Sequence, residues 1–514
     1  MHCHESSQIA TKFEKRGNLC LETFALLKSY FYRMRSFMSQ ICLIVLTFVL
    51  ASCAAFQIEK PTRSASESLK LPELWTQAGK GNEGKIAMGW LAAFSDGEME
   101  KLVQEAMTHN FDLQSAASRL QNAKEGTVLG RAGRLPNFSI SGSGSRSGSR
   151  SQDGSGDLGP WDQSTNYGLS LNTSWEIDLW GRLRDLEEAT VHDYVAARAD
   201  FRSARLSLAA NTAKAWCNLI AAGQQVESAI LTRESFLRNY RITERNYKGG
   251  DLTASPLSVQ FGRNNVASAE RSLLARRLGK DNSARALEVL LGRYPSAEIQ
   301  EKADLPNLPK NVPVGLPSEL LMRRPDLMAA AADVLASASR AEASRKSLLP
   351  PIRLSGGAST SSQELLDLIA DPRSIAWNVA SSIAQTIYQG GAPSAQARRA
   401  LINNKAAIEN FASTALRAFR EVESTLATDH SLAEQEIFLD TELKQAILAE
   451  QQSERDFTEG LASTLEVLEA QRRANNARNS MIALRNQRLQ NRIDLHLALG
   501  GDFETTSAEP SPSS

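Results

Sequence analysis

The sequence is poor in cysteine and has no excess charge of either sign. Only five of its 514 residues are cysteines, and Cys3, Cys20 and Cys42 lie in a segment that we expect to be removed. The remaining two, Cys53 and Cys217, cannot form a network of intramolecular disulfides. Cys217 lies in an Ala- and Leu-rich stretch and is expected to be a buried small hydrophobic residue.

Charge and motif content exclude several functions. Lysine plus arginine and aspartate plus glutamate each total 58, so a zero net charge gives no support to a nucleic-acid partner. His109, His192, His430 and His496 are scattered, with no nearby cysteine or carboxylate at metal-ligand spacing, and His2-Cys3-His4 lies in the segment expected to be removed. The Gly-Ser-Gly triplets lack the order of a nucleophile elbow. We therefore predict no enzymatic activity, no cofactor and no metal site.

Long apolar runs are also scarce, apart from one near the N-terminus. Residues 41–50 read ICLIVLTFVL, and Arg33 and Arg35 precede them. A basic region, a short apolar region and then small residues form a secretory signal peptide. As a helix the run would reach about 15 Å, roughly half of a bilayer core, so a membrane-spanning helix fits it less well.

The apolar run ends in a sequence that resembles a bacterial lipobox, formed by Leu50, Ala51, Ser52 and Cys53. In such a motif the cysteine becomes the lipidated first residue, so we predict removal of residues 1–52. A start at Met34 or Met38 would give a signal of normal length. Ala54, in place of the aspartate that often retains lipoproteins in the inner membrane, leaves the outer membrane open. The alternative is a chance cysteine behind a signal peptide.

After Cys53 no apolar stretch is long enough for a transmembrane helix, so strands must make any membrane crossing. The chain is also duplicated: residues 112–142 align without a gap with residues 326–356. Asp112-Leu113 matches Asp326-Leu327, and Leu135-Pro136 matches Leu349-Pro350. The two copies indicate a repeated module of helix, two strands and two helices.

The first module contains the clearest strand. An Ala-rich helix is expected over about 97–132, then strands at about 137–147 and 165–179 around a Gly- and Ser-rich loop. From Tyr167 to Leu179 the odd positions are mostly apolar and the even positions polar. Such alternation places one face in an apolar medium and the other in water, and about 9–11 residues suffice for a tilted membrane strand.

The second module repeats these elements with weaker alternation, at about 351–359 and 374–388. Residues 181–247 contain no proline and only one internal glycine, Gly223, and residues 394–458 behave likewise; at 1.5 Å per residue they predict helices of about 100 Å. Each is followed by a returning helix, to about 292 or 499, which indicates coiled-coil-like hairpins. Four strands of a soluble sandwich are the alternative, but they would leave these helices without a sheet to cover.

These elements predict an α+β membrane protein. Its expected parts are a lipidated segment 53–96, a first repeat 97–294, a Pro-rich linker 295–317, a second repeat 318–501 and a disordered tail 502–514. Four strands cannot close a barrel, and an open edge in lipid leaves backbone groups unpaired. Several chains must therefore pool their strands, and two, three or four remain possible on physical grounds.

Several motifs together resemble the outer-membrane efflux protein family of the TolC/OprM type, in particular its lipoprotein branch. They are residues 90–96, 110–113, 174–182, 315–326 and 467–471. The resemblance implies a homotrimer with a 12-stranded outer-membrane β-barrel and a periplasmic α-helical barrel. It further implies a periplasmic adaptor and an inner-membrane pump, of the RND type, as partners. The strand-to-helix turns carry Gly181 and Gly390-Gly391, but the second turn lacks the usual aspartate.

The resemblance also suggests functional positions. Glu466 and Glu469 match acidic residues that ring the narrow periplasmic end of such channels; the alternative is a pair of ordinary solvated helix residues. Trp175, Trp180 and Trp377 are candidate membrane-interface aromatics. The implied function is a passive exit duct for small toxic molecules. A type I protein-secretion channel and a periplasmic coiled-coil scaffold that does not cross the membrane are the alternatives.

Overall fold

The computed structural model describes residues 75–76, 89–152, 158–250, 254–302, 304–309, 312, 314–315, 317–365 and 375–503. The predicted signal segment, the lipobox and Cys53 lie outside these residues, as does most of the stretch 53–96. In the described part of the chain, no helix has both the length and the apolar character needed to cross a membrane.

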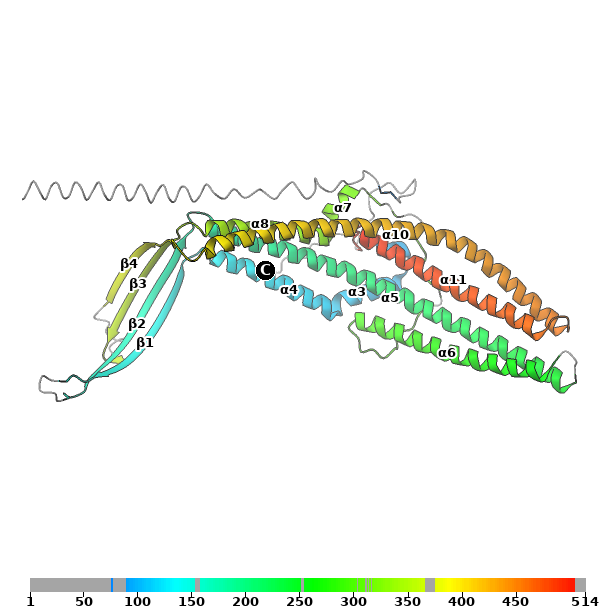
Figure 1. Ribbon diagram of the computed structural model, residues 1–514. Helices are drawn as coiled ribbons and strands as arrows, with labels where there is room; N and C mark the ends of the chain where they lie inside the picture. The colour runs from blue at the N-terminus through cyan, green and yellow to red at the C-terminus, as the bar shows by residue number, and fades with distance from the viewer. Residues whose placement is uncertain are drawn as a thin grey trace, which may run out of the picture. The chain divides into compact units, whose positions relative to one another are not determined.

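A module of one helix, two strands and two long helices occurs twice along the chain, each time after shorter helical segments (Figure 1). The first set comprises η1 (Trp90–Phe94), α3 (Gly97–His109), α4 (Phe111–Ala132), β1 (Asn137–Ser149), β2 (Asp162–Ile177), α5 (Arg182–Lys248) and α6 (Pro256–Leu290). The second comprises α7 (Pro317–Arg323), α8 (Pro325–Lys346), β3 (Ile352–Ser362), β4 (Ile375–Ile383), α10 (Ala392–Thr458) and α11 (Thr464–Ala498). The duplication predicted from the sequence is confirmed.

Three pairs of corresponding helices have identical lengths. Helices α4 and α8 both have 22 residues, α5 and α10 both have 67, and α6 and α11 both have 35. The strand register repeats as well: Phe138 opposes Thr173, and their counterparts Ile352 and Ile383 oppose each other. A residue of α4, α5 or α6 therefore has a defined counterpart 214, 210 or 208 positions later.

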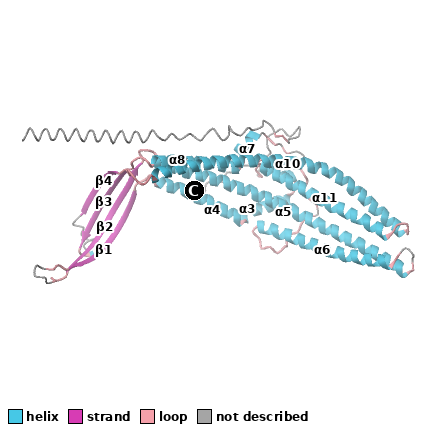
Figure 2. Ribbon diagram, in the orientation of Figure 1, coloured by secondary structure: helices cyan, strands magenta, loops and turns pink. Residues whose placement is uncertain are grey.

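The four strands form one antiparallel sheet in the order β1-β2-β3-β4. Each strand continues directly from, or into, one of the helices α4, α5, α8 and α10, and the strands are gathered at one end of these helices (Figure 2). In the described chain, β1 and β4 each have one edge without a partner strand. The sheet is therefore open on both sides.

The helices next to the sheet follow the same order as the strands. α4 packs on α5, α5 on α8 and α8 on α10. Farther from the sheet, α6 replaces α4 as the neighbour of α5, and α11 replaces α8 between α5 and α10. The long helices α5 and α10 thus run through both groups of helices. In the group next to the sheet, α4 and α10 lie at the two edges.

The first predicted helix, 97–132, is divided in the structure. α3 ends at His109, and Asn110 is extended with φ −68° and ψ 124°. Its side chain accepts a hydrogen bond from the Leu113 amide at 2.9 Å and donates one to the Leu290 carbonyl at 2.9 Å. Asparagine is a favoured N-cap because its side chain replaces the missing backbone partner, and here it also ties α4 to the end of α6.

The fourth strand is shorter than predicted, because it ends at Ile383 and not near residue 388. Its partner β3 begins at Ile352, directly after Pro350 and Pro351. Prolines have no N–H to donate to a strand ladder, so β3 offers no partner beyond that point. Strand β2 likewise ends at Ile177 and not at the predicted residue 179, because Ile177 pairs with Ile352, the first residue of β3.

Candidate channel wall and hairpin tip

The sheet has one apolar face to which all four strands contribute. Cross-strand pairs on this face include Ile140 with Leu171, Trp175 with Leu354, and Gly356 with Val379. Phe138 is 68% exposed and Trp377 is 77% exposed, so nothing in the described chain covers this face. It matches the predicted odd face of residues 167–179, whose contact with lipid remains a prediction.

The opposite face of the sheet is polar. The Ser141 and Ser170 hydroxyls are 2.7 Å apart, and Asn172 donates to the Ser170 hydroxyl at 3.2 Å. Glu176 opposes Arg353 across β2 and β3. A sheet with one apolar and one polar face separates an apolar medium from water, which is what the wall of a water-filled membrane channel requires.

Indole side chains tie the sheet to the helices. Trp175 donates to the Arg134 carbonyl at 2.8 Å, and Trp180 donates to the Pro350 carbonyl at 2.9 Å. Both bonds join segments that precede and follow strands, so both tryptophans lie at the junction between strands and helices. Trp377 lies elsewhere in the sheet: it opposes Ala358, and Ala358 opposes Leu171. Leu171 is four residues from Trp175, so Trp377 lies about 13 Å farther along the sheet at 3.3 Å per residue.

The two strand-to-helix turns use glycines in the left-handed region, with φ 74° at Gly181, 59° at Gly390 and 80° at Gly391. In the first turn the Asp178 carboxylate accepts from the amides of Leu183 and Arg184 at 3.0 and 2.8 Å. The counterpart of Asp178 is Tyr388, which cannot accept in this way and is exposed.

The first turn of α10 compensates for this missing aspartate with Pro393. Proline lacks the N–H that would otherwise need a partner at a helix start. The absent acid noted in the sequence therefore removes a polar contact without disturbing the turn.

At the far tip, Glu466 and Glu469 both have local partners. Glu466 accepts from the Ser463 amide at 2.7 Å and its hydroxyl at 2.9 Å, completing a capping box at the start of α11. Glu469 binds Arg473 at 2.8 Å and Arg472 at 2.6 Å. These hydrogen bonds lower the pKa of both carboxyl groups. The proposed carboxylate ring remains a prediction, since it requires further copies of the chain.

A buried polar cluster next to the tip was not predicted from the sequence. Gln471 is fully buried on α11 and donates to the Ser235 hydroxyl on α5 at 2.6 Å and to Glu454 on α10 at 2.9 Å. Ser235 also donates to Glu454 at 3.0 Å. The cluster joins the α5–α6 hairpin to the α10–α11 hairpin. In the sequence, nothing distinguishes any one of these residues from an ordinary helix residue.

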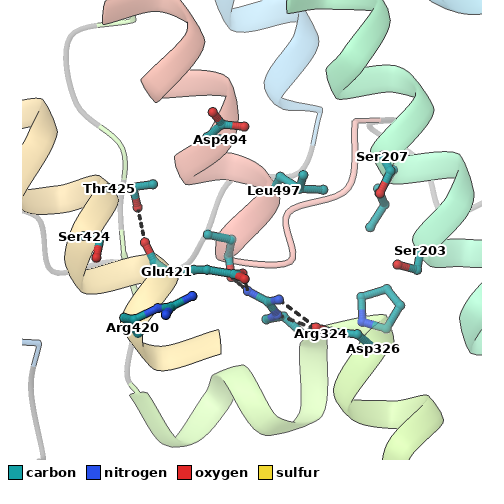
Figure 3. A pocket seen from close by; sticks show the side chains of 13 residues that line it. Ser203, Ser207, Arg324, Asp326, Arg420, Glu421, Ser424, Thr425, Asp494 and Leu497 are labelled. Atoms are coloured by element: carbon teal, nitrogen blue, oxygen red, sulfur yellow. Dashed lines mark hydrogen bonds and ion pairs between the residues drawn. The ribbon is translucent and has the colours of Figure 1, made fainter. Parts of the chain in front are cut away.

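A second unpredicted feature is a pocket of about 610 Å³ where α8 begins and α11 ends (Figure 3). Arg324 binds Asp326 through two hydrogen bonds, of 3.0 and 2.7 Å, and also donates to Glu421 and the Ala498 carbonyl. Figure 3 shows Ser203 and Ser207 of α5 on the other side of the pocket. Arg324 is the counterpart of Asn110, and Ala498 that of Leu290, so both repeats tie corresponding helix ends together.

Among the residues that the structure describes, no group of histidine, cysteine, aspartate or glutamate side chains is arranged to hold a metal ion. Two surface features can carry a function: an amphipathic sheet with two open edges, and the long helical hairpins that continue from it. These define a subunit of a membrane channel.

Comparison with known proteins agrees with this class. The model of the outer membrane efflux protein family matches residues 102–293 and 316–501, which correspond to the two repeats. The chain is 30% identical over 420 residues to the cation efflux system protein CusC of Escherichia coli O6:H1, covering 81% of this chain and 88% of that one. It therefore belongs to the outer membrane efflux protein family.

Two further relatives support this membership. The probable outer membrane lipoprotein SilC of Salmonella typhimurium is 27% identical over 418 residues, covering 81% of this chain and 88% of SilC. The solved structure of the open MtrE outer membrane channel of Neisseria gonorrhoeae is 26% identical, with a TM-score of 0.71, covering 88% of this chain and 99% of MtrE. The fold and the outer-membrane efflux function predicted from the sequence are confirmed.

Proposed function

We propose that three copies of this chain form a passive exit duct for small toxic molecules or ions. The observation that carries the proposal is the amphipathic sheet whose two edges are unpaired in the described chain. Backbone groups at such edges are costly in lipid, and pooling strands from several copies removes the edges. Three copies would supply 12 strands and a lumen, and the helices would continue the wall into the periplasm.

The duct requires partners that supply energy and cargo. We propose that the hairpin tips receive a periplasmic adaptor and an inner-membrane pump of the RND type, and that the chain itself catalyses no reaction. CusC is named as a cation efflux protein, which makes cations the first cargo to test. The polar face of the sheet carries Ser and Asn side chains of no particular selectivity, so the pump would determine the substrate.

We also propose that the chain is anchored by a lipid on Cys53, because Leu50-Ala51-Ser52-Cys53 follows the apolar run directly. Stable anchoring takes two lipid signals, such as two acyl chains. Mass spectrometry of the mature N-terminus should find an acylated cysteine at this position. The Cys53→Ser variant should lose the added mass and reach the outer membrane more slowly. An unmodified N-terminus at another residue would refute the anchor.

Channel activity and the tip glutamates can be tested together by single-channel recording in planar bilayers. The purified protein should conduct, and divalent cations on the periplasmic side should block the current if three copies of each glutamate face one axis. Glu466→Gln/Glu469→Gln should weaken this block severalfold. Glutamine still serves in a capping box, so the helix start should be preserved.

Glu459→Gln is the matched control, because this exposed glutamate lies at the same tip outside the predicted ring. It should leave the block unchanged. No conductance from the unaltered protein would reject the duct. Conductance with equal block in all three proteins would keep the duct and identify Glu466 and Glu469 as solvated helix residues.

A further inference from the structure

Helix α10 has a long exposed face whose counterpart on α5 is buried. Ala199, Leu206 and Ala210 of α5 are covered by neighbouring helices of the same chain and are at most 6% exposed. Their counterparts on α10 are Glu409, Leu416 and Arg420, and all three are exposed; Leu416 is 57% exposed. Within the described chain, the α10 face therefore has no covering helix.

Helix α4 shows the complementary difference. Ala329, Ala332 and Ala336 on α8 are buried in the helix layer of the chain. Their counterparts on α4 are Ser115, Ser118 and Asn122, and each of these is exposed. Phe111, the counterpart of buried Pro325, is 70% exposed at the start of α4. This face of α4, from Phe111 to Asn122, is thus the one that its repeat counterpart uses for packing.

The hollows on the helices repeat as well. Ser203, Leu206 and Ser207 of α5 form one wall of the pocket in Figure 3, and Pro325 and Asp326 of α8 line it from the facing side. The counterparts of the first three are Ser413, Leu416 and Arg417, which line an open hollow on α10. This second hollow is a half-site: it has the α10 wall, and no described element of the same chain supplies the other.

We infer that the start of α4 from a second copy of this chain completes the hollow on α10. We call this contact between α4 of one copy and α10 of another the seam. In the seam, Phe111 of the second copy lies against Leu416, just as Pro325 faces Leu206 within one chain. Asp112 of the second copy, the counterpart of Asp326, faces Arg417. The inference rests on the proposed assembly of several copies and assigns the residues and register of its helical contact.

Charge complementarity favours this occupant. Arg417 donates a hydrogen bond to the Thr414 hydroxyl at 3.2 Å, and neither Arg417 nor Arg420 has a carboxylate partner among the described residues. Asp112 similarly has no cationic partner in the described chain. In the α5–α8 contact the ion pairs lie nearer the sheet, between Arg340 and Asp193 and between Lys346 and Asp185. The counterparts of these four residues in the other repeat are all uncharged. The seam therefore uses a charge pair of its own.

Charge reversal tests the pair. Asp112→Arg and Arg417→Asp should each increase the rate of oligomer dissociation in detergent by about tenfold, as expected when one partner of a desolvated pair is lost. The combined variant should recover most of the lost stability, because the pair is restored with reversed polarity. Lys101→Asp, the same change of charge on the exposed surface of α3, is the control and should have no effect. Failure of the double variant to recover would refute the pair.

Cross-linking tests the register. Cys217 is fully buried and its burial raises the pKa of the thiol to about 12, so it should not react. Phe111→Cys and Leu416→Cys, expressed as single variants in the same cells, should give cross-linked dimers with a short bis-maleimide. Ser118→Cys with Leu416→Cys should not, because Ser118 lies two turns away, about 10 Å along the helix.

The outcomes separate the two proposals. If native mass spectrometry finds only single chains, the assembly and the duct fail together. If the protein is trimeric but cross-links through Ser118 in place of Phe111, the duct stands and the register proposed here is wrong. Cross-linking through Phe111 together with recovery by charge reversal supports the seam.

Discussion

Leu171→Arg should prevent assembly in the outer membrane, whereas Ser170→Arg should allow it. Leu171 lies on the apolar face of β2 between Ile140 and Ala358, and its side chain is 47% exposed in the single chain. A charge on the lipid face costs about 2–4 kcal/mol at the middle of the membrane. Every copy in the assembly carries this cost.

Ser170 provides the matched comparison, because it occupies the next position at the same depth. Its hydroxyl lies 2.7 Å from that of Ser141 on the polar face. An arginine there would enter water and should alter conductance more than assembly. The amount of folded oligomer in outer-membrane fractions, judged by its resistance to detergent, measures the assembly of both variants. Equal losses from the two arginine variants would show that the faces are assigned wrongly.

The repeat explains why the sequence was informative about architecture. Two copies of one module provide two independent views of each element, so the clear alternation of residues 167–179 identified the weaker fourth strand by position. The helix limits were also well predicted, because glycine and proline mark both ends of α5 and α10. The break at Asn110 was missed because asparagine also occurs inside helices, and only the contact with Leu290 reveals the cap.

The tip was less predictable for a physical reason. The role of Glu466 and Glu469 in a channel depends on their distance from symmetry-related copies, which no pattern within one chain determines. The single chain instead shows bonds from Ser463, Arg472 and Arg473. Gln471 illustrates the same limit, because its burial depends on the packing of α5, α10 and α11.

His496 gives a second large effect, this time of pH. It is 3% exposed near the end of α11, stacks on Trp90 at 5.7 Å and contacts the edge of Phe94. Neither ring nitrogen has a hydrogen-bond partner among the described residues. Burial, with a smaller contribution from the nearby Arg492 charge, lowers its pKa from 6.5 to about 4. The folded protein therefore keeps this ring neutral in mildly acidic solution.

The sign of the effect follows from the two pKa values. Well above pH 6.5 His496 is neutral in both folded and unfolded chains, so it contributes no pH dependence there. As the pH falls toward 4, the unfolded chain takes up a proton that the folded chain refuses, and stability is lost. The loss should reach about 2 kcal/mol at pH 5 and about 3 kcal/mol at pH 4, since one pKa unit corresponds to 1.36 kcal/mol.

Thermal unfolding in detergent at pH 7 and pH 5 should reveal this loss as a lower unfolding temperature at pH 5. His496→Phe should remove most of the difference, because phenylalanine fills the site beside Trp90 and cannot be protonated. His430→Phe is the control, since it removes a histidine whose side chain is 79% exposed. The counterpart of His496 in the first repeat is Glu288, which accepts three backbone hydrogen bonds and has a lowered pKa, although burial opposes it. Its stabilising effect is lost only below about pH 4.5, so the interval from pH 7 to pH 5 separates the two residues. A His496→Phe variant that loses as much stability as the unaltered protein between these values would place the acid sensitivity elsewhere.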